Sequence, residues 1–323
     1  MIRCPVCGWQ AAEGFSVEEQ VVGYTVYRCP RCDVRFAWPF RAPPQVFYAP
    51  QAGEEWRLNA YLVPLWFLWA GRPLPLSSAH RTFLARVPVR GKRVLDVGSG
   101  ECTFLRAVQQ RGGEAWGLDP SPNGQRFCTL QGVRRFFPGT LEAFHQQHPH
   151  LRFHVITLFE VLEHLDRPRE TLELLYRMLV PGGHLGISVP DETRTSLRLG
   201  LPRFPQDYPP HHLTRWTPRA LRYALEHAGF RILSHLSLPP DPGYSIARRL
   251  PFPTTTERFL AWLRSPPPGA HVRWKILRVW DGLRWRDQGL RMLLWPLQVL
   301  LRWARIRGLT QLVIAQKPKE AER

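Results

Sequence analysis

Short apolar runs alternate with amphipathic stretches along the central half of the chain, which is the pattern of a β/α fold. The first apolar run, 94–97, contains one acid, Asp96, and is followed by two glycines, Gly98 and Gly100. The residues after these glycines, 103–111, predict a helix. Glycine at such a turn lets the backbone bend sharply and come close to a ligand. The pattern therefore predicts a buried parallel strand that ends at a binding loop.

Four further strands are predicted in the same region, at 115–118, 133–137, 153–158 and 184–189. Asp119 closes the first of them, 21 positions after Gly98. Doubly wound folds place a carboxylate for ribose hydroxyl groups at about this distance. A helix is predicted over about 168–179, and Pro181-Gly182-Gly183 is interpreted as its stop. Because strands and helices alternate throughout, we expect a parallel sheet with helices on both faces.

Several of these segments resemble a known family. The strings VLDVGSG, GLDP, GTLEAF, FEVLEHL, LVPGGHLGISVP and HHLTRWTPRALRYALEHAGF resemble class I S-adenosylmethionine-dependent methyltransferases. The most similar branch contains the ubiquinone-biosynthesis O-methyltransferases and many small bacterial methyltransferases. The resemblance covers about 91–237, with a last strand at 311–317. It implies an α/β fold with a Rossmann-like, doubly wound, mostly parallel seven-stranded sheet, and S-adenosyl-L-methionine (SAM) as the cofactor.

The resemblance also implies which residues hold this cofactor. Gly98 and Gly100 would shape the turn beside the methionine moiety, Asp96 would support the turn, and Asp119 would bind the ribose hydroxyls. The borders of the adenine would be Thr140 and Leu141, and those of the methionine end Phe159 and Glu160.

Two positions depart from the family pattern. Cys102 stands where the third glycine of the loop is usual, and His154 stands where an acid often precedes the fourth strand. Neither change blocks the site on steric grounds. A nicotinamide-binding domain is the alternative, but the third glycine of its fingerprint would fall at Thr103. Cys102 and Cys128 are interpreted as ordinary small apolar residues.

The residues that would remove a proton from the acceptor are less sharply indicated. His164 and His212 are candidates, because a histidine near neutral pKa can take a proton from a hydroxyl or amine group. In ubiquinone-type relatives the pattern Glu-x-x-Glu-His, here Glu160, Glu163 and His164, is associated with a divalent metal near the substrate hydroxyl. The alternative is that Glu163 and His164 only brace the following helix. The candidate catalytic residues are therefore His212, His164 and Glu163.

A second strong pattern lies near the N-terminus. Two Cys-x-x-Cys knuckles, Cys4 with Cys7 and Cys29 with Cys32, are separated by 21 residues. This spacing is typical of a zinc ribbon, in which four thiolates bind one tetrahedral ion. Two disulfides or a redox pair are the alternatives, and the absence of a predicted signal peptide argues against an oxidising compartment. We therefore expect a structural Zn²⁺ in the segment 1–40.

Composition changes the picture mainly in one segment. The formal net charge is +18, and 244–308 alone holds 13 Lys/Arg against 3 Asp/Glu, together with six of the 13 tryptophans. This segment predicts a helical insertion before the last strand. It is interpreted as a lid on the core, as an element for an anionic membrane surface or lipid substrate through 271–307, or as a nucleic-acid-binding element. The apolar run at 61–70 is too short to span a bilayer.

The predicted organisation has five parts: a zinc ribbon (1–40), a linker with a helix near 54–69 (41–90), a methyltransferase core (91–243), the basic insertion (244–308) and the last strand with a tail (309–323). The expected function is methyl transfer to a small-molecule, sugar- or lipid-linked metabolite. A ribosomal or transfer RNA methyltransferase and a non-catalytic zinc scaffold are the alternatives. The RNA alternative lacks the Asn/Asp-Pro-Pro-aromatic motif of amino-methylating enzymes. We expect a cytoplasmic protein that also contacts the inner membrane surface peripherally.

Overall fold

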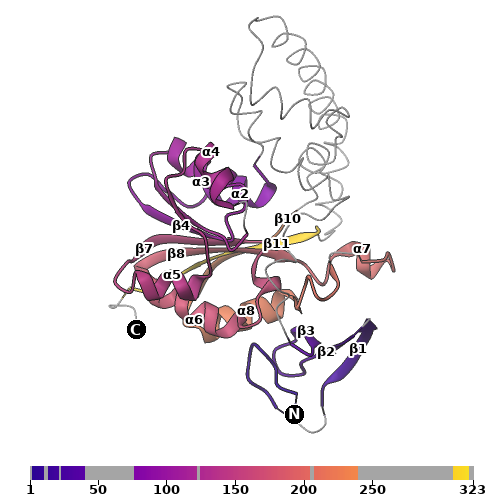
Figure 1. Cartoon of the computed structure of the whole chain (residues 1–323). Helices are drawn as coiled ribbons and strands as arrows, with labels where there is room; N and C mark the ends of the chain where they lie inside the picture. The colour runs from indigo at the N-terminus through magenta and orange to yellow at the C-terminus, as the bar shows by residue number, and fades with distance from the viewer. Residues whose placement is uncertain are drawn as a thin grey trace, which may run out of the picture. The chain divides into compact units, whose positions relative to one another are not determined.

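Two sheets, one of seven strands and one of four, organise the residues that the computed structural model describes (Figure 1). The described residues are 2–10, 14–21, 23–40, 76–121, 124–203, 207–238 and 308–319. The predicted helix near 54–69 and nearly all of the predicted basic insertion lie outside them. Within the described residues, no helix has the length and apolar character needed to cross a membrane.

The larger sheet has the strand order β10-β11-β8-β7-β4-β5-β6. Its strands are β4 (Arg93–Val97), β5 (Glu114–Leu118), β6 (Arg135–Phe137), β7 (Phe153–Phe159), β8 (Leu179–Pro190), β10 (Arg231–Leu238) and β11 (Thr310–Gln316). Every neighbouring pair from β6 to β8 is parallel, whereas β11 runs antiparallel to both β8 and β10. The predicted mostly parallel seven-stranded sheet is therefore confirmed.

Helices cover both faces of this sheet, with α2, α3 and α4 on one face and α5, α6 and α8 on the other (Figure 1). Their bounds are α2 (Ser78–Leu84), α3 (Thr103–Gln110), α4 (Gly124–Leu130), α5 (Leu141–Gln147), α6 (Pro168–Met178) and α8 (Pro218–His227). Two short helices, η2 (Leu162–His164) and α7 (Thr195–Arg198), lie in connections. Threonine hydroxyls cap α5 and α8, because Thr140 and Thr217 accept hydrogen bonds from backbone amides of the first turn.

The smaller sheet combines the N-terminal segment with a later part of the chain. Its order is β1-β2-β3-β9, with β1 (Ser16–Val21), β2 (Tyr24–Arg28), β3 (Arg35–Trp38) and β9 (Thr214–Arg215). All three pairings are antiparallel. The fourth strand comes from the segment just before α8, so the N-terminal sheet is completed by residues nearly two hundred positions later in the sequence.

The observed strands lie within a few residues of the predicted ones, with one difference at β8. The sequence predicts a stop at Pro181-Gly182-Gly183, but the strand already begins at Leu179 and passes through these residues. Gly182 has φ +76°, and its N–H donates to the carbonyl of Lys317 at 2.9 Å. The backbone of the residue that directly follows β11 thus supplies the hydrogen bond that keeps this turn inside the sheet.

A second correction concerns two cysteines. Cys102 and Cys128, interpreted from the sequence as ordinary apolar residues, are joined by a disulfide in the structure, and both are fully buried. Cys102 caps α3 and Cys128 lies on α4, which share one face of the sheet. Their proximity depends on this packing of two helices, which no local pattern in the sequence reports.

The approach of α2 to the sheet depends on a glycine of β8. Phe83 of α2 is fully buried, and a Cβ added at Gly186 would lie 2.4 Å from Cε2 of its ring. The same ring contacts those of Phe104 and Phe159, with centroid distances of 6.1 and 5.8 Å. Gly186 therefore leaves the space that this aromatic cluster needs above the sheet.

We expect Gly186→Ala to destabilise the fold by about 1–3 kcal/mol, because the added methyl group overpacks the contact with Phe83. Urea unfolding would measure the loss. Combining the change with Phe83→Leu, which removes the clashing ring edge, should recover part of it. An unchanged unfolding midpoint for Gly186→Ala would show that the contact is not as tight as the structure has it.

Candidate functional site

The predicted glycine turn lies at the carboxyl end of β4. The N–H groups of Gly98 and Ser99 both donate to the carbonyl of Leu118, at 2.8 and 3.0 Å, which ties the turn to the end of β5. Gly98 and Gly100 have φ of +71° and +48°, a region that favours glycine. A Cβ on Gly98 would lie 2.5 Å from Cγ2 of Val161, whereas a Cβ on Gly100 would meet nothing within 4 Å. The turn is thus packed on one side and open on the other.

Asp119 closes this turn from the end of β5. Its Oδ2 accepts a hydrogen bond from the N–H of Gly100 and its Oδ1 one from the N–H of Ser121, both at 2.8 Å. Burial raises the pKa of Asp119, and the two amide hydrogen bonds oppose this effect. An ionised carboxylate has about four lone-pair positions, so two amides leave room for further donors. The open side of the turn and this carboxylate fit the ribose end of SAM.

Asp96 supports the sheet beneath the turn. It is buried, and its Oδ1 accepts a hydrogen bond of 2.6 Å from the hydroxyl of Thr157 on β7. Burial raises the pKa of Asp96 to about 7, and the hydrogen bond from Thr157 opposes the rise. Asp96 therefore links β4, which leads into the turn, to the neighbouring strand β7.

The other predicted cofactor residues lie at the ends of β6 and β7. Thr140 caps α5, and Leu141 is buried in the first turn of that helix. Phe159 ends β7 within the aromatic cluster, 5.0 Å from the ring of Phe104. Glu160 follows with φ +56°, and its Oε1 accepts a 2.8 Å hydrogen bond from the hydroxyl of Ser188. That these residues contact a cofactor stays a prediction.

The three candidate catalytic residues lie together. Ligand atoms of Glu163, His164 and His212 all lie within 4.8 Å of one another. The two imidazole rings are 4.8 Å apart and inclined by 69°. A backbone hydrogen bond of 2.9 Å from the N–H of Leu213 to the carbonyl of Glu163 joins the two segments that carry them. The structure thus brings together residues that the sequence could only name separately.

The hydrogen bonding of His164 defines its tautomer. Its Nδ1 lies 2.6 Å from the backbone carbonyl of His211. Because a carbonyl only accepts, Nδ1 carries the hydrogen, and Nε2 faces Glu163 with a lone pair. Burial lowers the pKa of His164 to about 4 and, together with the nearby His164, lowers that of His212 as well. Both rings are therefore neutral at pH 7 and can accept a proton or bind a metal.

Glu163 is the least solvated member of this cluster. Its side chain is 1% exposed, and neither carboxyl oxygen has a hydrogen-bond partner among the described residues. Burial, followed by the charge of Glu160, raises the pKa of Glu163 well above its usual value. Burial therefore favours the protonated form of Glu163, whereas a nearby cation would favour the carboxylate, and one carboxylate with two imidazoles is a donor set that suits a divalent transition metal.

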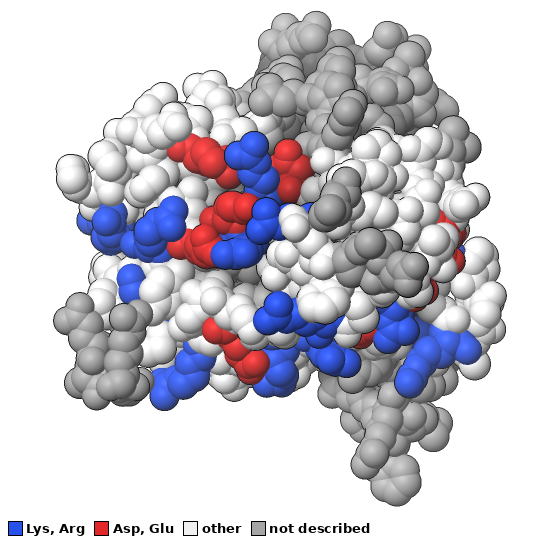
Figure 2. Space-filling model, turned by 90° about the horizontal axis from the view of Figure 1, so that it is seen from below, with Lys and Arg blue, Asp and Glu red and all other residues white. Residues whose placement is uncertain are grey.

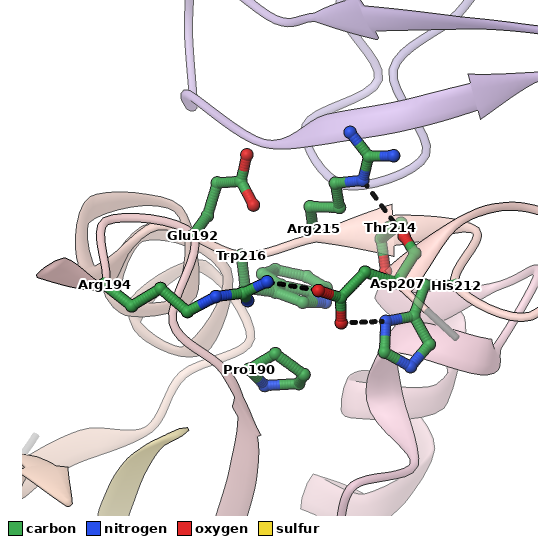
Figure 3. A pocket seen from close by; sticks show the side chains of 8 residues that line it. All are labelled: Pro190, Glu192, Arg194, Asp207, His212, Thr214, Arg215 and Trp216. Atoms are coloured by element: carbon green, nitrogen blue, oxygen red, sulfur yellow. Dashed lines mark hydrogen bonds and ion pairs between the residues drawn. The ribbon is translucent and has the colours of Figure 1, made fainter. Parts of the chain in front are cut away.

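A pocket beside His212 contains charged residues that the sequence reasoning missed (Figure 3). It is lined by Pro190, Glu192, Arg194, Asp207, His212, Thr214, Arg215 and Trp216. Asp207 forms an ion pair with Arg194, and its Oδ1 lies 3.6 Å from Nδ1 of His212. Glu192 accepts two hydrogen bonds of 2.6 Å from Arg203. The charged ones lie in connections (Glu192, Arg194 and Asp207) or in the two-residue strand β9 (Arg215), so no local periodicity marks them.

The four predicted zinc ligands also meet in the structure. The sulfur atoms of Cys4 and Cys32 are 3.6 Å apart, and those of Cys7 and Cys29 are 3.5 Å apart. Four sulfurs at about 2.3 Å from one tetrahedral ion stand about 3.8 Å from each other, so the arrangement fits Zn²⁺. None of the four is in a disulfide, which leaves the disulfide alternative without support.

Comparison with known proteins places this site in a family. A family model described as "Methyltransferase domain" matches residues 68–235, about half of the chain. The chain belongs to the class I SAM-dependent methyltransferases. A ubiquinone biosynthesis O-methyltransferase of Pseudomonas entomophila (strain L48) is 36% identical over 108 residues, which cover 32% of this chain and 46% of the relative. That of Pectobacterium carotovorum subsp. carotovorum (strain PC1) is 31% identical over 133 residues, covering 38% and 55%.

This methyltransferase thus spans about half the length of the curated relatives that it matches. Two solved structures are also similar. A SAM-dependent methyltransferase from Archaeoglobus fulgidus is 21% identical, with a TM-score of 0.46 over 73% of this chain and 90% of its own. One from Mesorhizobium loti is 17% identical, with a TM-score of 0.43 over 74% and 95%.

We expect Glu163→Gln to raise the melting temperature at pH 8 by a few degrees, about 3–5 °C. Because the folded-state pKa of Glu163 is raised, the stability that its protonation contributes is complete below about pH 4, the ordinary pKa. That stability is lost as the pH rises toward and through the folded-state pKa, and glutamine stays neutral throughout. The advantage of Glu163→Gln should therefore grow between pH 5 and pH 8, as calorimetry without added divalent metal would measure.

The matched control is Glu170→Gln, which removes an exposed carboxylate and should leave the melting temperature within about 1 °C. An equal melting temperature for the wild type and Glu163→Gln at pH 8 would mean that Glu163 already has a stabilising partner in solution.

Proposed function

We propose that the protein transfers a methyl group from SAM to an acceptor placed beside Glu163, His164 and His212. The observation that carries this proposal is the shared location of two features. The glycine turn closed by Asp119 follows the carboxyl ends of β4 and β5, and Glu163 and His164, which lie beside His212, follow that of the neighbouring parallel strand β7. Open α/β sheets bind their ligands at this edge.

The cofactor, when bound, supplies a methyl group already activated on a sulfonium. Gly98 and Gly100 let the backbone approach the ligand, and Asp119 accepts hydrogen bonds from the ribose hydroxyls. Asp96, at the end of β4, supports the turn and is itself held by the hydrogen bond from Thr157 of β7. The adenine borders on Thr140 and Leu141, and the methionine end borders on Phe159 and Glu160. The chain therefore has to align the acceptor with the methyl–sulfur bond, and such positioning alone can supply a large part of the rate.

Proton removal from a hydroxyl acceptor is assigned to the histidine cluster. A neutral His212 or His164 would accept the proton that a hydroxyl acceptor gives up as the methyl group passes from the sulfonium sulfur of the bound cofactor to the acceptor oxygen. The Nε2 of His164 is the atom on the Glu163 side, and it carries the lone pair. A divalent cation held by Glu163 and the two imidazoles is a second way to lower the acceptor's pKa, and the unpartnered carboxyl group of Glu163 supports it.

For the acceptor we propose a small-molecule, sugar- or lipid-linked metabolite. The support is the name of the relatives, which are ubiquinone biosynthesis O-methyltransferases. On the face shown in Figure 2, acidic and basic side chains lie beside one another, so the described residues there make no continuous basic field. More than half of the surplus of basic residues lies in the predicted insertion, through which we propose contact with an anionic membrane surface at 271–307. Zn²⁺ on Cys4, Cys7, Cys29 and Cys32 has a structural role in this proposal.

Asp119→Ala should weaken SAM binding by about 100-fold, because two hydrogen bonds to a charged group are lost. Isothermal titration calorimetry would measure the affinity, and metal analysis should find the zinc content unchanged. Ser121→Ala is the matched control, since it keeps the backbone N–H that Asp119 accepts from. Wild-type affinity in Asp119→Ala would make the ribose assignment wrong, and no SAM binding by the wild type would overturn the proposed function.

Deleting 244–307 tests the acceptor class. The full chain should sediment with vesicles containing anionic phospholipid at about 0.15 M salt, and the deletion should not, because the basic surplus is lost. SAM affinity of the deletion serves as the control for folding. Tight binding of total RNA at the same salt concentration would favour the RNA methyltransferase alternative. Binding to neither would identify the insertion as a lid.

A further inference from the structure

The segment after His212 belongs to the same four-stranded sheet as the N-terminal ribbon. Strand β9 pairs with β3 of the ribbon, with Phe36 opposite Thr214 and Arg35 opposite Arg215. The N–H of Ala37 also donates to the carbonyl of Leu213 at 2.9 Å. β9 directly follows His212, so the ribbon forms hydrogen bonds with the segment that carries this histidine.

A chain of polar contacts continues from the ribbon to His212. Glu19 of β1 accepts a 2.8 Å hydrogen bond from Nη1 of Arg215, whose side chain is 5% exposed. The Nε of Arg215 donates to the backbone carbonyl of Asp207 at 3.2 Å. Asp207 in turn pairs with Arg194 and places its Oδ1 3.6 Å from Nδ1 of His212 (Figure 3). Each link is made by a group that is mostly or fully shielded from solvent, where such contacts are strongest.

The same segment is held from the far side of β9 as well. The hydroxyl of Thr217 donates to Oδ2 of Asp33 at 2.8 Å, and Asp33 belongs to the second cysteine knuckle. Within this knuckle, the N–H of Asp33 donates to the carbonyl of Cys29 at 2.9 Å. Hydrogen bonds therefore connect the predicted zinc ligand Cys29 to one end of 213–217, at Thr217, while β3 of the ribbon holds the other end, at Leu213.

We propose that Asp207 and Arg215 are positioning residues for His212, and that the zinc ribbon holds them in place through Glu19. The ribbon thereby fixes the position of His212, which accepts the proton from the acceptor in the proposed function. This inference rests on the proposed function for the role of His212, but its contacts exist without it. It gives the ribbon a role in positioning a residue of the candidate catalytic site of its own chain.

Glu19→Gln is the variant that tests the proposal, because it weakens the ion pair to Arg215 without touching the core. Hydrogen exchange should become about tenfold faster over 207–217, since the free energy of local opening falls. In protein labelled with ¹³C at histidine Cε1, the resonance of His212, assigned with His212→Gln, should shift or broaden. Glu19→Asp, which keeps the charge, should restore both readouts at least in part.

Glu226→Gln is the matched control, because it weakens an exposed ion pair, with Arg222 at 3.6 Å, that lies outside the contacts between the ribbon and His212. It should leave the His212 resonance and the exchange of 207–217 unchanged. The resonance of His154, which contacts the N–H of Arg93 at the other end of the sheet, should not respond to any of these variants. SAM affinity should stay the same in Glu19→Gln, because the glycine turn has no contact with Glu19 among the described residues.

Removing the zinc with a chelator is the second arm. Exchange should rise over the ribbon and over 207–217, and remain slow in β4 and α3. A ribbon that loses protection while 207–217 keeps it, or a His212 resonance that ignores Glu19→Gln, would overturn the inference. If zinc removal unfolds the whole chain, the exchange of 207–217 and the His212 resonance in the Glu19 variants decide whether the inference stands. A wild type that binds no SAM but couples Glu19 to His212 would overturn the proposed function and leave the positioning role standing.

Discussion

The peptide groups around Leu213 are the connection on which the candidate site depends. The N–H of Leu213 donates to the carbonyl of Glu163, and its carbonyl accepts from the N–H of Ala37 in the ribbon. One residue thus links the loop after β7 to the N-terminal sheet. Together with the hydrogen bond from Nδ1 of His164 to the carbonyl of His211, this link sets the distance from His212 to Glu163 and His164, whose segments are not neighbours in the large sheet.

The ion pairs buried between the ribbon and the core select one way of docking the ribbon more than they stabilise the folded chain. Arg215 with Glu19 and Arg35 with Glu192 each join the ribbon to the core and are largely shielded from solvent. Desolvation of such pairs offsets most of their attraction, whereas a pair that is broken leaves an uncompensated charge. The pairs therefore penalise any other docking of the ribbon, and this selects the register in which β3 pairs with β9.

Much of the sheet could be predicted because its signals are local. Apolar runs mark the strands, and the glycine turn, Asp119 and the four cysteines follow patterns with short spacing. β9 has two residues and no period of its own, so its pairing with β3 could not be predicted. Asp207 and Arg194 lie in a connection, and the meeting of Cys102 with Cys128 depends on two helices packing side by side. Each of these features is decided by tertiary contacts that no window of sequence contains.

The buried carboxyl groups and imidazoles of the candidate site suit the binding of a cation. Burial raises the pKa of Glu160 to about 7 and that of Glu163 well above its usual value, while it lowers those of His164 and His212. Burial thus favours the uncharged form of each of the four groups. A positive charge in the site favours the ionised carboxylates and disfavours imidazolium. Under the proposed function, the sulfonium of the cofactor would be such a charge, so its binding would favour the ionised form of Glu160 and the neutral form of both histidines.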